Sequence, residues 1–162
     1  GGSDVNNLTM PLLKILAKTY PDLKFTVVSI QNKFNWHYSR NKRIKFVKNP
    51  SEKKLVSLLL GHDLAIASGG HLLFELACIG MPTIHVKSTK DQVVSVPWKD
   101  TGFTRYAGSA KQRDLHENII QEIEYYNDFT KRIMSSKFGS RLIDGKGAKR
   151  LAQKILSKVN EK

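Results

Sequence analysis

The feature that most constrains the fold is the segment at residues 63–82, DLAIASGGHLLFELACIGMP. Its apolar run at residues 63–68 predicts a short buried strand, the Gly69-Gly70 pair predicts a sharp turn, and residues 71–79 predict a helix. Glycines let the backbone bend and approach a ligand closely, and the free N–H groups at a helix start attract anions. A strand, a glycine turn and a helix in this order indicate a phosphate or nucleotide site.

Glu75 makes this prediction more specific. It lies on a helix that is otherwise apolar on nearly every side, so we expect it to be buried, where an unpaired carboxylate is costly. Its side chain would lean back over the first turn, beside His71. There it would accept hydrogen bonds from the vicinal hydroxyls of a ribose, while the turn amides hold phosphate. The alternative is a carboxylate at the domain edge that is paired with a Lys or Arg.

The composition predicts one soluble domain. A chain of 162 residues that is 40% hydrophobic can bury one ordinary core, and it contains neither a signal-peptide pattern nor an apolar run near the roughly twenty residues of a membrane span. The single cysteine, Cys78, lies in the apolar helix, so we expect a buried thiol, no disulfide and no metal cluster. These features favour a cytoplasmic protein that needs no cofactor.

The net charge of +13 predicts attraction to anions, which include nucleic acids, anionic lipid surfaces and phosphorylated small molecules. The densest basic patch, at residues 40–54, contains Phe46 alone among aromatic residues, and the other aromatics, Phe34, Trp36 and Tyr38, lie just upstream. Single-strand binders interleave aromatic and basic residues along the bound strand. We therefore expect no nucleic-acid partner, whereas peripheral association with a membrane surface stays open.

The order of elements predicts an α/β fold. β-Branched or apolar runs predict strands at residues 24–30, 43–49, 63–68 and 82–87, with a weak edge strand at 103–107. Amphipathic segments predict helices after residue 9 and at residues 51–60, 71–79 and 115–126, followed by a helical tail broken near 139–147. Such alternation is typical of a Rossmann-like, mostly parallel sheet with helices on both faces.

The start of the chain, GGSDVNNLT, reads as a glycine-rich loop that enters a helix, with Asn6, Asn7 or Thr9 as the cap. A loop of this kind normally follows a strand. We therefore expect residues 1–162 to form one nucleotide-sugar-binding domain that lacks its first strand and an N-terminal partner domain. The loop and the Gly69-Gly70 turn would both lie at the carboxyl ends of strands and face one crevice.

Two polar residues follow the strand at 82–87. Asp91 and Gln92 would lie at its carboxyl end, where they either cap a short helix or face a bound sugar. Neither the dinucleotide fingerprint GxGxxG nor the P-loop GxxxxGK[ST] occurs in the sequence. Their absence argues against a dehydrogenase or an ATPase.

Four segments together resemble a known family: GGSDVNNLT, DLAIASGG with Glu75 five residues later, KSTKDQ and DGKGAKRLAQKIL. They are similar to the C-terminal, UDP-binding half of GT-B-fold enzymes that act on UDP-sugars. The resemblance is closest to the UDP-sugar hydrolase of the pseudaminic acid pathway and its spore-coat polysaccharide biosynthesis relatives. It is more distant to the UDP-N-acetylglucosamine transferase that forms lipid II.

The resemblance implies a set of site residues. These are Gly2 and Ser3 at the diphosphate or sugar, the amides of Gly69, Gly70 and His71 at the phosphates, Glu75 at the ribose, the backbone near Phe46 and Val47 at the uracil, and Gln92 with Asp91 at the sugar. Two positions depart from the family pattern, because His71 stands where a small residue such as Ser is common and Asp91 where Asn is usual.

The resemblance also implies where catalysis occurs. In the hydrolase the general base is a histidine of the N-terminal half, and His37, His62 and His116 of this chain are interpreted as surface residues. We therefore expect this chain to bind UDP or a UDP-sugar beside an N-terminal domain of the same enzyme, with little turnover by itself. The alternatives are a non-catalytic nucleotide-sugar module fused to a larger enzyme and, with less support, a basic nucleic-acid-binding domain.

Overall fold

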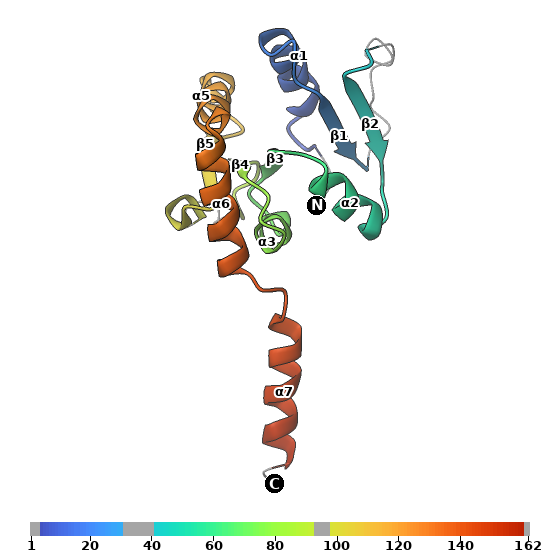
Figure 1. Cartoon of the computed structure of the whole chain (residues 1–162), viewed down its shortest axis with the longest axis vertical. Helices are drawn as coiled ribbons and strands as arrows, with labels where there is room; N and C mark the ends of the chain where they lie inside the picture. The colour runs from blue at the N-terminus through green and yellow to red at the C-terminus, as the bar shows by residue number, and fades with distance from the viewer. Residues whose placement is uncertain (1–3, 31–40, 93–97, 161–162) are drawn as a thin grey trace.

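The computed structural model describes residues 4–30, 41–92 and 98–160. Helices and strands alternate along the chain, as predicted (Figure 1). In chain order they are α1 (Thr9–Thr19), β1 (Phe25–Ser29), β2 (Ile44–Lys48), α2 (Glu52–Leu60), β3 (Ala65–Ser68), α3 (Leu72–Cys78), β4 (Thr83–Lys87), η2 (Lys99–Thr101), β5 (Thr104–Ser109), α5 (Leu115–Asn127), α6 (Phe129–Leu142) and α7 (Gly147–Asn160).

All pairs of neighbouring strands in the described chain are parallel, which confirms the predicted α/β, Rossmann-like class. The strands form two sheets instead of the single sheet expected, with β1 beside β2 in one and the order β3-β4-β5 in the other. β1 and β3 are therefore each an edge strand of a separate sheet. Residues of both strands line a common cleft.

The second sheet contains the best-packed part of the molecule. Every residue of β4 from Thr83 to Val86 is buried, as expected for a strand covered on both faces. The edge strand β5 is longer and better buried than the weak strand predicted at 103–107. A bulge between its residues 106 and 108 shifts the register opposite β4, and Gly108, with a φ of 122°, accommodates it.

Helices cover both faces of this sheet. On one face, Ile84 and Val86 of β4 pack with α5 and with Leu16 of α1. On the other face, the buried residues of α3 pack with Trp98 and Phe103. A third cluster, formed by Leu13, Val27 and Ile44, joins α1 to the β1–β2 sheet. The buried apolar residues of the described chain thus form three clusters around two sheets.

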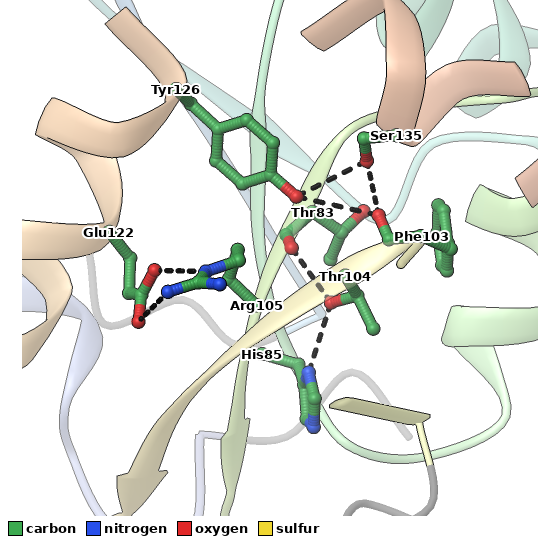
Figure 2. A network of polar contacts seen from close by, with 8 residues as sticks. All are labelled: Thr83, His85, Phe103, Thr104, Arg105, Glu122, Tyr126 and Ser135. Carbon is green, nitrogen blue, oxygen red and sulfur yellow. Dashed lines mark hydrogen bonds and ion pairs between the residues drawn. The ribbon is translucent and has the colours of Figure 1, made fainter. Parts of the chain in front are cut away.

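A buried polar network ties β4 and β5 to the helices beyond them (Figure 2). The Thr104 hydroxyl donates to the Thr83 carbonyl at 2.7 Å and lies 3.0 Å from Nδ1 of His85, so Nδ1 is the donor in that contact. The hydroxyls of Tyr126 and Ser135 both donate to the carbonyl of Phe103. His85 is therefore a buried structural residue.

Local contacts fix where the helices begin and end. Asp4 caps α1, because its carboxylate accepts from the N–H groups of Leu8 and Thr9, both at 2.8 Å. The prediction that Asn6, Asn7 or Thr9 supplies this cap was wrong. Ser51 caps α2 as expected, because its hydroxyl oxygen accepts from the backbone N–H of Lys54 at 3.4 Å.

The helical tail is broken at residues 143–146, between α6 and α7. This break is shorter than the predicted one near 139–147, since α6 continues through the buried Gly139 and ends at Leu142. Beyond the break, α7 projects away from the rest of the molecule (Figure 1). All of its side chains from residue 147 to 159 are exposed, although apolar and basic residues segregate along it. Among the described residues, no helix is long and apolar enough to cross a membrane.

Candidate nucleotide site at the carboxyl edge of the strands

The carboxyl ends of β1, β3 and β4 border one cleft with a volume of about 630 Å³. Ser29, Ser68 and Ser88 line it where these three strands end. The loop of residues 4–6 and the first residues of α3 also line this cleft. In open parallel α/β sheets ligands bind at this edge, since loops there are free to vary and helices begin there.

The loop before α1 is held against the end of β4. The Asn6 side chain donates from Nδ2 to the Ser88 carbonyl at 2.7 Å, which joins two segments 82 residues apart. Asn7 has a φ of 51°, the left-handed conformation that asparagine tolerates, and turns the chain into the helix. Gly2 and Ser3, which we predicted to contact a diphosphate or sugar, lie outside the described residues.

The Gly69-Gly70 turn follows β3 as predicted, but its own amides are already bonded. The Gly69 N–H donates to the Val86 carbonyl and the Gly70 N–H to the Ser68 carbonyl, both at 2.8 Å. Within the described ranges, the next two amides, those of His71 and Leu72, have no backbone acceptor. The amides that are free to bind an anion therefore begin later in the chain than the sequence predicted. Of the three predicted amides, those of Gly69, Gly70 and His71, only that of His71 is free in the described part of the chain.

Glu75 lines the cleft one turn into α3, and its side chain is exposed where the sequence predicted burial. Cys78 is also exposed, so the prediction of a buried thiol was wrong. Both errors have one cause: α3 buries only Leu73, Leu76 and Ala77, while its other side faces the cleft and the linker before α7. Among the described residues, Glu75 forms neither an ion pair nor a side-chain hydrogen bond, so the expected alternative, pairing with Lys or Arg, is not found there.

Gln92 lies beside the glycine turn. Its Oε1 accepts from the Ser88 N–H at 2.8 Å, and its Nε2 would be 3.6 Å from a Cβ added at Gly70. Asp91 is exposed, and a hydrogen bond from the Thr89 hydroxyl lowers the pKa of its carboxyl. Residues 93–97, where we expected the short helix that these two side chains would cap, are outside the described ranges.

Phe46 and Val47, predicted near the uracil, lie on β2 and are not among the residues that line the cleft. The register places Val47 opposite Val28, one strand away from the cleft. Of the predicted site residues, the structure brings His71 and Glu75 into the cleft. Gly70 and Gln92 lie beside each other but do not line it, and neither do Gly69 and Asp91. The Phe46–Val47 backbone lies to one side. A ligand that reached these two residues would have to extend across the end of β1.

Two histidines that we interpreted as surface residues line the cleft. His62 is half-buried, with Nδ1 2.6 Å from the Leu58 carbonyl and Nε2 2.9 Å from the Thr26 hydroxyl. His116 is also half-buried, and its Nε2 is buried without a hydrogen-bond partner in the described part of the chain. The sequence gives no sign that either histidine lines a cleft, because their neighbours there come from distant segments. His37 lies outside the described residues.

Basic residues also end two of the strands. Lys48 is the last residue of β2 and Lys87 the last residue of β4, so both lie at the same edge as the cleft. Arg43, by contrast, donates to the carbonyls of Tyr20 and Leu23 beyond the end of α1. Within the described ranges, no group of three His, Cys, Asp or Glu side chains is placed to hold a metal ion.

Comparison with known proteins shows distant relatives. The spore coat polysaccharide biosynthesis protein SpsG of Bacillus subtilis is 26% identical over 155 residues, which cover 91% of this chain and 45% of SpsG. An uncharacterised protein of Methanocaldococcus jannaschii is 32% identical over 93 residues, 52% of this chain and 19% of that protein. No family model matches the chain. The chain therefore spans less than half the length of either relative and is distantly related to a spore coat polysaccharide biosynthesis protein.

Proposed function

We propose that this chain is the UDP-binding half of a GT-B-fold hydrolase or glycosyltransferase that uses a nucleotide-sugar in surface polysaccharide or nonulosonic acid biosynthesis. The observation that carries the proposal is the meeting, in one cleft at the carboxyl edge, of the loop at residues 4–6 with Ser68, His71 and Glu75. The similarity to SpsG over 91% of the chain supports the same pathway class.

The polar groups of the cleft match the parts of a UDP-sugar. An exposed Glu75 carboxylate accepts hydrogen bonds from the two ribose hydroxyls. The amides of His71 and Leu72 donate to the diphosphate, and the net charge of +13 favours such an anion. Gln92 does not line the cleft, but it lies beside Gly70, from where its side chain would reach the sugar.

In this proposal the chain acts by holding the diphosphate as a leaving group. Donors that are fixed before the reaction stabilise the charge that develops when the bond to the sugar breaks. The attacking water or acceptor hydroxyl, and the base that activates it, belong to an N-terminal domain of the same enzyme. Residues 1–162 alone are therefore expected to bind UDP and to release little or no sugar from it.

Calorimetric titration with UDP, CDP and UMP tests the proposal. UDP is expected to bind with a Kd between micromolar and millimolar and UMP more weakly, because UMP lacks one phosphate. The Glu75→Ala variant should lose about 1 to 3 kcal/mol of binding free energy, the cost of removing a hydrogen-bond partner. Asp22→Ala is the matched control, since it also removes one exposed carboxylate. Asp22 precedes β1 and so lies at the amino ends of the strands, away from the cleft.

Gly70→Ala separates binding from folding. A Cβ at this position would meet no atom closer than 3.6 Å, so the free energy of unfolding should stay constant or rise by about 0.4 to 1 kcal/mol. The same methyl group would stand where the diphosphate approaches the turn, and UDP affinity should fall. If UDP binds no better than inorganic phosphate, or if Asp22→Ala weakens binding as much as Glu75→Ala, the proposal is wrong.

A further inference from the structure

The cleft continues from the carboxyl edge into a slot between the two sheets, which we define by residues 24–30, which contain β1, and residues 64–68, which contain β3. Both strands belong to wholly parallel sheets, yet each is an edge strand. Val28 is 42% exposed and Ile66 is 37% exposed. Apolar residues in the middle of parallel strands are normally covered on both faces, so this exposure requires an explanation.

Backbone hydrogen bonds show which groups face the slot. Phe25 donates to the Arg43 carbonyl and Ser29 accepts from Asn49, so the odd-numbered residues of β1 bond to β2. Alternate residues of a parallel strand direct their N–H and C=O groups to opposite edges. The backbone groups of Thr26 and Val28 therefore point into the slot.

The opposite wall has the same arrangement. Ala65 donates to the Pro82 carbonyl and Gly69 to the Val86 carbonyl, so these residues of β3 face β4. By the same alternation, Ile66 directs its backbone groups into the slot. In the described part of the chain, the backbone groups of Thr26, Val28 and Ile66 make no backbone hydrogen bond on this side. Two rows of ladder groups thus face each other without joining.

The helices that cover the slot contribute mostly apolar side chains to it. Helices α1 and α5 contribute side chains from one face of the sheets, and α2 and α3 contribute side chains from the other. These side chains are Leu8, Leu12, Leu16 and Ile119 on the first face and Leu55, Leu59, Leu72 and Leu76 on the second. A strand between them would bury alternate side chains above and below, so all of its residues would be apolar.

The position of the α1 loop gives the direction of such a strand. Asp4 lies in the cleft at the carboxyl edge, and the Asn6–Ser88 hydrogen bond holds the following turn there. A chain that leaves a parallel strand in the slot emerges at this edge and continues into α1 and then β1. That path makes a βαβ unit, the connection that joins neighbouring parallel strands.

We infer that the slot is the seat of a parallel β-strand of about five apolar residues, supplied by the polypeptide directly before residue 1. It would join the two sheets into one six-stranded parallel sheet with the order β2-β1-strand-β3-β4-β5. The matched region covers only 45% of SpsG, which leaves ample chain for such a segment in a protein of that length. This inference does not rest on nucleotide binding.

A designed extension tests the inference. The segment Lys-Val-Ile-Val-Ile-Val-Thr is added before Gly1 of the whole chain, and a matched control carries Lys-Ser-Gly-Ser-Gly-Ser-Thr instead. Thermal unfolding, amide hydrogen exchange and sedimentation are compared for the extended, control and unextended proteins. Val28→Pro in the extended protein removes one slot-facing N–H group and, by the alternation above, no bond to β2.

The apolar extension should raise Tm by at least about 4 °C, since each kcal/mol corresponds to about 2 to 4 °C in a chain of this size. It should also slow exchange of the Thr26, Val28 and Ile66 amides at least about tenfold. The control extension should do neither, and Val28→Pro should cancel most of the gain in Tm.

Three results would overturn the inference. The first is a Tm that the apolar extension does not change. The second is full protection of the Thr26, Val28 and Ile66 amides in the unextended chain, which would mean that β1 and β3 pair directly. The third is a stable dimer of the unextended chain that the extension leaves intact, which would assign the slot to a second copy.

Discussion

The hydroxyl of Tyr126 lies where α5, α6 and β5 meet, 3.2 Å from the Ser135 hydroxyl and 3.4 Å from the Phe103 carbonyl (Figure 2). The side chain is 2% exposed, and burial raises the pKa of its phenol to about 12. Ser135 donates to the same carbonyl, so two hydroxyls satisfy one buried backbone oxygen. Such a fully bonded network holds three elements in one arrangement.

The raised pKa of Tyr126 makes stability depend on pH in alkali. In the unfolded chain this phenol loses its proton near pH 10, whereas in the folded chain it does so near pH 12. The contribution of this phenol to the free energy of unfolding is therefore complete below about pH 10. It is lost as the pH rises to about 12, a change of about 2 to 3 kcal/mol. Urea unfolding of Tyr126→Phe between pH 8 and pH 11.5 should show a smaller decline than the unchanged protein.

A comparison variant distinguishes this effect from general alkaline unfolding. The pKa of Tyr20 is also raised, first by burial and then by its hydrogen bond to Glu124 at 2.6 Å. Tyr20→Phe should therefore remove a separate part of the decline and leave the Tyr126 part in place. Equal slopes for Tyr126→Phe and the unchanged protein would contradict the assignment.

The helices of this chain differ in what holds them in place. Ser135 and Gly139 of α6 are buried, and a Cβ at Gly139 would lie 2.6 Å from the Phe103 ring. By contrast, α7 exposes Leu151, Ile155 and Leu156, each between 56% and 62% exposed. Helices of 14 residues are marginal in water without packing. Stability therefore resides in the chain up to α6.

Truncation measures this difference between helices. A chain that ends at Asp144 lacks α7 and should change the free energy of unfolding by less than about 0.5 kcal/mol, as exposed positions do. A chain that ends at Asn127 also lacks α6, with its buried Ser135 and Gly139, and should lose most of its stability. The measurement is urea unfolding followed by circular dichroism. A large loss on removal of α7 alone would show that α7 packs against the body in solution.

At the scale of the whole molecule, the described chain has a divided core. The cluster around Ile84 and the cluster around Leu76 lie on the two faces of the β3–β5 sheet, whereas Val27 and Ile44 belong to a third, smaller cluster beneath α1. The slot separates the third cluster from the β3–β5 sheet. Parts of a protein with few buried contacts open without global unfolding.

Hydrogen exchange should reveal this division. Amides of β4, such as those of Ile84 and Val86, should exchange only through global unfolding, because the strand is buried and paired on both edges. Amides of β1 that bond to β2, such as that of Val27, should exchange through a partial opening with a lower free energy. Measuring exchange against denaturant concentration separates the two mechanisms. Identical free energies for β1 and β4 would show a single cooperative unit.

The sequence by itself determined the elements and their type. The predicted strands at 24–30, 43–49, 63–68 and 82–87 are each present with slightly shorter bounds, since β-branched runs between turn residues are local signals. The same holds for the Ser51 cap and for the glycine turn after β3. The alternation of these elements was sufficient to predict a parallel α/β fold with helices on both faces.

Only the tertiary structure decided which sides of the elements are covered. Cys78 and Glu75 are exposed because α3 packs along one side only, and the sequence of an apolar helix does not show how many neighbours it has. His62 and His116 line the cleft because distant segments meet there. The separation of β1 from β3 is likewise invisible in the sequence, since strand pairing depends on contacts between residues far apart in the chain.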